Sequence, residues 1–158
     1  MPNGRHDQPL ASSVLDRLVK RNEPSPAGPA FNRNQVLRDL KQSVGRDLSD
    51  LLNTRARCEF LPAGCDALSD SLVGYGLPEF AHARAAEFQE LVKEVITRYE
   101  PRLRNVRVQV VRNADSADRT LRFHITASLN VEPALEPLVF ESQRDPVTGA
   151  IEVKVEGQ

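Results

Sequence analysis

One carboxylate in the sequence lies among arginines and is the residue best placed to do chemistry. Glu100 precedes Pro101, and Arg98, Arg102 and Arg104 all lie within four positions of it. Such a carboxyl group could be the proton donor of a glycoside hydrolase, which needs a pair of carboxyl groups. Neighbouring cations keep a carboxylate ionised, however, and an ionised group has no proton to donate. The pattern therefore favours an ion pair over a catalytic acid.

The other reactive side chains do not form a recognisable metal, cofactor or nucleophile site. The only cysteines, Cys58 and Cys65, have no clustered histidine, so we interpret them as small hydrophobic residues with reduced thiols. The loop Gly74-Tyr75-Gly76 lacks the lysine that a phosphate-binding loop requires. No histidine has a second one at metal-ligand spacing; the histidines are His6, His82 and His124. We expect no catalytic residue, no metal and no cofactor.

Composition and charge argue against several classes of partner. The formal net charge is -1, so no overall field attracts nucleic acid or an anionic membrane. Phe123 has no second aromatic residue at the spacing of an RNA-binding strand. No apolar stretch resembles a signal peptide or is long enough to span a bilayer. We expect a cytoplasmic protein without nucleic acid, membrane insertion or a small-molecule substrate.

The chain is predicted to divide into an arm, residues 1–32, and a single domain, residues 33–158. Five prolines interrupt the arm. Ser12 or Ser13 can cap one short helix there, with Leu15 and Leu18 on its apolar face. Because such a helix is too short to persist alone, it either packs on its own domain or docks in a partner's groove. Both alternatives remain open.

Two longer helices are predicted to support the Glu100 region. Apolar residues at steps of three and four form a stripe over residues 34–56, interrupted only by Gly45, which weakens the helix. A second stripe runs over residues 85–99 and stops before Pro101, because the residue preceding a proline is disfavoured in a helix. Glu100 therefore lies at the end of a helix.

After Pro101 the apolar period changes from helical to alternating. Strands are predicted over residues 106–111, 121–131, Leu138–Ser142 and Ile151–Val155, with Pro133 and Pro137 bracketing a hairpin connection. Helices followed by consecutive antiparallel strands indicate the α+β class, with amphipathic helices packed on one face of a small, mainly antiparallel sheet.

Several sequence blocks, in order along the chain, together resemble one family. The blocks are Ser13–Leu18, Ser43–Leu48, Leu51–Arg55, Ser71–Pro78, Tyr99–Leu103, Asp118–Phe123 and Val131–Pro133. They resemble the TssE family of type VI secretion baseplates, relatives of a wedge protein of contractile phage baseplates. The phage relatives are often labelled lysozyme-like, so a peptidoglycan-cleaving hydrolase is the alternative.

The resemblance implies a non-enzymatic baseplate subunit on the cytoplasmic side of the inner membrane, where it meets other wedge subunits and the base of the sheath. It also implies that Glu100-Pro101-Arg102 is the signature site, next to Leu103; from the residues alone it would be a helix end with solvated charges. An exposed strand edge can accept a partner's strand, and we expect this edge at Leu138, Val139 and Phe140 or at Ile151–Val155. Reversing the charge of Glu100 or Arg102 is expected to spare the fold and block sheath assembly.

Overall fold

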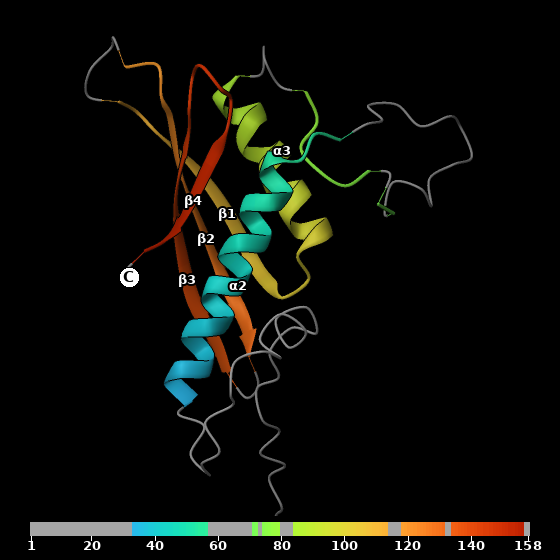
Figure 1. Cartoon of the computed structure of the whole chain (residues 1–158), viewed down its shortest axis with the longest axis vertical. Coiled ribbons are helices and arrows are strands. Elements are labelled where there is room, and N and C mark those ends of the chain that lie inside the picture. The colour runs from blue at the N-terminus through green and yellow to red at the C-terminus, as the bar shows by residue number, and fades with distance from the viewer. Residues whose placement is uncertain are drawn as a thin grey trace, which may run out of the picture.

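The structure, a computed structural model, describes residues 33–56, 71–72, 74–79, 84–113, 118–131 and 134–156. Figure 1 shows the arrangement of its helices and strands. The elements are α2 (Arg33–Asn53), α3 (Ala85–Tyr99), β1 (Leu103–Val111), β2 (Leu121–Val131), β3 (Ala134–Arg144) and β4 (Ile151–Val155). The predicted arm with Leu15 and Leu18, and both cysteines, lie outside the described residues.

The strands form one antiparallel sheet in the order β1-β2-β3-β4. Side chains alternate between its faces, and in β2 Phe123, Ile125 and Leu129 are buried while Arg122, Thr126 and Asn130 are exposed. Both helices cover the buried face (Figure 1). The predicted α+β class is therefore confirmed.

Helix α3 follows from its local sequence. The backbone N–H of Arg84 donates to the Glu87 carboxylate at 2.9 Å, which satisfies one free donor at the start of the helix. The apolar stripe faces the sheet, where the rings of Phe88 and Phe123 meet edge to face at 5.2 Å. The helix ends at Tyr99, as Pro101 predicts.

Helix α2 approaches β4 closely at Gly45. A Cβ atom at this position would lie 3.3 Å from Cγ2 of Val155 and 3.8 Å from the Phe140 ring. The missing side chain therefore lets the middle of α2 approach the end of β4. This close approach explains a glycine that the sequence pattern identified only as a weak point of the helix.

β3 is longer than predicted. It begins at Ala134, so Pro137 lies inside the strand rather than in the connection before it. Val139, two residues later, accepts a hydrogen bond from Glu156 N on the side of β4. Because backbone groups alternate in direction along a strand, the nitrogen of Pro137 points to the same side as the carbonyl of Val139. Pro137 lies beyond the residues of β3 that pair with β4, so the proline removes no hydrogen bond of that ladder.

Among the described residues, no helix is both long enough and apolar enough to cross a membrane.

Candidate functional site

Glu100, Pro101 and Arg102 form a tight turn between α3 and β1. Glu100 N still donates to the carbonyl of Ile96 at 2.9 Å, and its own carbonyl accepts from Leu103 N at 3.1 Å. Pro101 takes the second position of this turn, which its fixed φ suits. The carbonyl of Arg102 then accepts from Asn130 N of β2 at 2.8 Å. The turn is therefore held at both ends by backbone hydrogen bonds.

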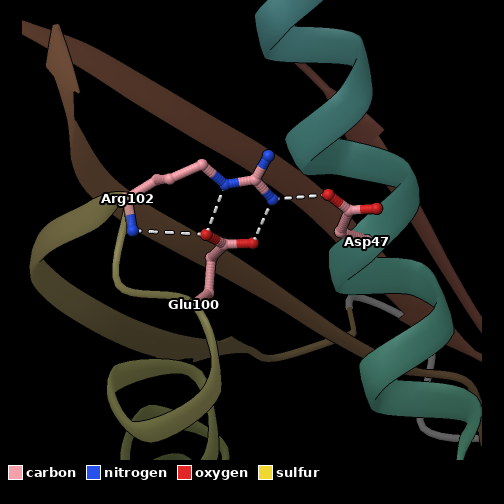
Figure 2. A network of polar contacts seen from close by, with 3 residues as sticks. All are labelled: Asp47, Glu100 and Arg102. Atoms are coloured by element: carbon pink, nitrogen blue, oxygen red, sulfur yellow. Dashed lines mark hydrogen bonds and ion pairs between the residues drawn. The ribbon is translucent and has the colours of Figure 1, made fainter. Parts of the chain in front are cut away.

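The side chains of the turn form an ion-pair network with α2 (Figure 2). Nε of Arg102 donates to Oε1 of Glu100 at 2.6 Å, and Nη2 donates to Oε2 of Glu100 and to the Asp47 carboxylate. The contact between Arg102 and Glu100 is therefore bidentate, as is common where a guanidinium group faces a carboxylate. One arginine thus connects the end of α3 and the start of β1 to the middle of α2.

Burial makes this network different from a surface ion pair. The Glu100 side chain is 6% exposed and that of Arg102 is 30% exposed. Hydrogen bonding to Glu100, more than that to Asp47, raises the pKa of Arg102 above its already high ordinary value, although burial opposes this shift. The interpretation of Glu100 as a solvated charge is wrong: its carboxylate is buried and paired within the chain.

A hollow opens beside the network. It is lined by Asp47, Asp50, Leu51, Tyr75, Tyr99, Glu100, Pro101 and Arg102. Pro101 and Asp50 are exposed at this site. The rings of Tyr75 and Tyr99 meet edge to face at 5.3 Å. Burial, followed by the negative charges of Asp50, Asp47 and Glu100, raises the pKa of Tyr75.

The loop carrying Tyr75 is held against the end of α2. Leu77 N donates to the carbonyl of Thr54 at 2.7 Å, and Ala56 N donates to the carbonyl of Leu77 at 3.1 Å. Gly76 adopts a φ of 113°, and a Cβ atom there would lie 2.5 Å from the carbonyl oxygen of Thr54. Only glycine fits this position, which explains the second glycine of the Gly-Tyr-Gly sequence.

In the described part of the site, the buried carboxylate of Glu100 is held in an ion pair. Glu100 accepts two hydrogen bonds from the Arg102 guanidinium group, so its carboxylate is held as an ion-pair partner. In the part of the chain that the structure describes, no three histidine, cysteine, aspartate or glutamate residues come together as a metal site. His124 lies partly exposed on the face of the sheet opposite the helices.

The predicted partner-binding residues occupy different environments. Leu103, Leu138 and Phe140 are buried core residues and offer no exposed side chain, whereas Val139 is partly exposed. From Val139 to Arg144, β3 lies between β2 and β4, so its second half is not a sheet edge. Of the two predicted edges, β4 is the outer strand, and Leu138–Ser142 lies largely inside the sheet.

Two residues that the sequence did not single out make contacts between α2 and the other elements. Asp47 is the second carboxylate partner of Arg102. The Asn53 side chain pairs with the first residue of β4: its Nδ2 donates to the carbonyl of Ile151 at 2.7 Å, and its Oδ1 accepts from Ile151 N at 2.8 Å. Both positions lie within the blocks that carry the resemblance, but their type and spacing give no local signal of these contacts.

The sequence around this site matches one known protein family. The family model of baseplate wedge protein gp25 matches residues 38–134, which is more than half of the chain. The chain belongs to this family. The baseplate wedge family corresponds to TssE in type VI secretion, so the resemblance found in the sequence is confirmed at this level. No curated protein and no solved structure matches the chain.

The match to the baseplate wedge family contains most of the site. It includes Asp47, Tyr75 and the turn at residues 100–103, together with Asn53, and ends before β4. Membership supports a structural role in a baseplate, which involves assembly with other baseplate subunits.

Proposed function

We propose that the chain is a structural baseplate subunit of a type VI secretion system. In this role it links the baseplate wedge to the base of the contractile sheath, on the cytoplasmic side of the inner membrane, and helps to initiate sheath assembly. The observation that carries the proposal is the family match over residues 38–134, which spans both the Glu100-Pro101-Arg102 turn and its partner Asp47.

The hollow beside the turn is the proposed contact for a neighbouring wedge subunit. Its base is rigid, because the Arg102 guanidinium group holds Glu100 and Asp47 together. Its rim offers the exposed ring of Pro101 and the exposed carboxylate of Asp50. A rigid, partly apolar hollow with a polar rim is typical of a protein-binding site. The buried ion pair thus shapes the contact surface, and Asp50 and Pro101 provide the contacts.

The outer edge of β4 is the proposed contact for the sheath. An edge strand presents unpaired backbone groups, and a partner's extended segment can add to it through a ladder of hydrogen bonds. β4 is the outermost strand of the described sheet on the side of α2.

The wedge contact can be tested with a charge reversal on the rim. Asp50→Arg changes an exposed residue of the hollow and is expected to abolish co-purification with wedge subunits while leaving the fold intact. Glu90→Arg, on the exposed face of α3, makes the same change of charge away from the hollow and is the matched control. Normal wedge assembly with Asp50→Arg would contradict this part of the proposal.

The alternative, a peptidoglycan-cleaving hydrolase, makes the opposite prediction about purified protein. The proposed structural role requires that the wild-type chain release no soluble fragments from purified cell walls. Turnover that disappears in a folded Glu100→Gln variant would overturn the structural assignment. Deletion of the chain should in contrast prevent sheaths from forming in the cell, and wild-type protein should restore them.

A further inference from the structure

We infer that the side chain of Asn53 fixes the register in which a partner's strand can add to β4. The inference rests on the proposed function, because it assumes that the outer edge of β4 receives an extended segment of the sheath subunit. The added segment must stop before Ile151, because Asn53 of α2 already binds the outward backbone groups of that residue.

The backbone N–H and C=O groups of β4 point alternately toward β3 and away from it. Glu152 and Lys154 lie opposite Gln143 and Glu141 of β3, and Glu156 N donates to the carbonyl of Val139. In an antiparallel ladder, alternate residues direct both their N–H and C=O groups to the same neighbour. The even-numbered residues of β4 therefore face β3, and Ile151, Val153 and Val155 face outward.

Asn53 occupies the first of these outward positions. Its amide makes two hydrogen bonds to Ile151, one to the N–H and one to the carbonyl, at 2.8 and 2.7 Å. This is the pair of bonds that a residue of an added strand would make. The Asn53 side chain is itself fixed, since Nδ2 also donates to the carbonyl of Ser49 at 2.7 Å. An added strand meets this side chain and α2 when it reaches Ile151.

The rest of the edge is open within the described part of the chain. The outward N–H and C=O groups of Val153 and Val155 are directed away from β3. A hollow runs beside them, lined by Gln42, Gly45, Arg46, Ser49, Val153, Lys154 and Val155. Gly45 has no side chain, so the backbone of α2 lies close to the side chain of Val155 here. An extended segment fits this surface because it satisfies the backbone groups, which a docked helix cannot do.

Hydrogen exchange, measured residue by residue on the full chain, tests the inference. In the free wild-type protein the Ile151 amide should exchange slowly, and those of Val153 and Val155 should exchange fast. Adding purified sheath subunit should protect Val153 and Val155 without changing Ile151. In Asn53→Ala the Ile151 amide should lose protection in the free protein and regain it in the complex, because the added strand now extends by one outward residue.

Renewed protection of the Ile151 amide in the Asn53→Ala complex distinguishes two roles of Asn53. In one role it limits how far the added strand extends, and in the other it only connects α2 to β4. A purely structural role predicts that Ile151 stays unprotected in the Asn53→Ala complex, and that result overturns the inference. Asn53→Asp is the matched control: its carboxylate still accepts from Ile151 N, so this amide should remain protected in the free protein. If sheath subunits protect neither Val153 nor Val155 in the wild type, the proposed sheath contact fails and the inference fails with it. Pairing of β4 with a second copy of the chain, seen as a dimer without sheath, would also overturn it.

Discussion

Arg102 joins three elements through one guanidinium group. Glu100, at the end of α3, is 6% exposed, whereas Asp47 of α2 is 41% exposed. The two carboxylates therefore depend on Arg102 to different degrees. A buried carboxylate that loses its cation remains as an uncompensated charge, while a carboxylate near the surface is hydrated instead.

Removing the arginine should therefore cost much more stability than removing its outer partner. Arg102→Met is expected to lower the free energy of unfolding by about 3–5 kcal/mol, because it leaves Glu100 buried without a cation. Asp47→Asn is expected to cost about 1 kcal/mol or less, the range of exposed pairs. Urea unfolding of both variants measures the difference. Equal losses, or a loss below about 1 kcal/mol for Arg102→Met, would contradict the structural role of the network. Because Glu100 and Arg102 are paired inside the chain, we expect Glu100→Arg and Arg102→Glu to destabilise the fold as well, contrary to the expectation from the sequence that either charge reversal spares it.

Asp118 should make stability depend on acid pH. Hydrogen bonds from the Thr120 side chain and backbone amide, and from Arg122, lower the pKa of Asp118 from 3.8 to about 2. The folded state thus favours the carboxylate, so the stabilisation is fully present above the unfolded pKa of 3.8 and is lost as the pH falls through about 2. Asp118→Asn should be less stable than wild type at neutral pH, and this difference should disappear between these two pH values. A difference that stays constant down to pH 2 would contradict this assignment.

At the residue scale, the sequence predicts the chemistry of the turn better than its partners. The arginines around Glu100 indicated an ion pair, and the structure contains one. Asp47 and Asn53, however, meet partners 55 and 98 positions away. No spacing rule along a helix can predict such contacts, because they depend on how α2 lies against the sheet. Burial of Glu100 was missed for the same reason.

Two glycines show how elements are fitted together. Gly45 lets α2 approach β4, and the nearest neighbour of a Cβ atom there would be the end of the Val155 side chain at 3.3 Å. Gly76 combines a φ of 113° with a backbone oxygen that a Cβ atom would meet at 2.5 Å. The first neighbour is a side chain of an edge strand and can move slightly, whereas the second is the carbonyl of Thr54.

Alanine at these two glycines should therefore have different effects. Gly76→Ala is expected to cost at least about 2 kcal/mol, since it strains the backbone and forces the Tyr75 loop away from α2. Gly45→Ala is expected to change stability by about 1 kcal/mol or less, because the gain in helix propensity offsets the tight contact. Thermal unfolding compares them, and a larger loss at Gly45 would show that β4 cannot adjust.

At the element scale, periodicity predicted most boundaries. α3, β2 and β4 begin and end where the apolar pattern changes, because each element shows a clear stripe or alternation. The length of β3 was missed, since a proline usually argues against a strand interior. Pro137 is tolerated because its nitrogen faces the part of the edge that β4 does not cover. That fact follows from the register of the hairpin, which residue types do not specify.

On the scale of the whole molecule, α2 separates the two proposed contact surfaces. Asp47, Asp50 and Leu51 line the hollow at the turn, whereas Gln42, Gly45, Arg46 and Ser49 line the hollow beside β4. With about 3.6 residues per turn, the centres of these two sets lie about 140° apart around the helix, and Asp50 is the member of the first set nearest to the second, one turn from Arg46. A single subunit could then contact a wedge subunit on one side of α2 and the sheath on the other side, without competition between the two partners.

This separation predicts that the two contacts can be removed independently. Val153→Pro deletes an outward N–H of β4 that β3 does not use, so the chain should fold, bind wedge subunits normally and fail to bind the sheath. Asp50→Arg should show the reverse pattern, with sheath binding kept and wedge binding lost. Lys154→Pro is the control for Val153→Pro, since it removes an N–H directed at β3 and should destabilise the hairpin. Pull-downs with each purified partner measure both contacts on the same protein. If either Val153→Pro or Asp50→Arg abolishes both contacts while the chain stays folded, the two surfaces are coupled and α2 does not separate them.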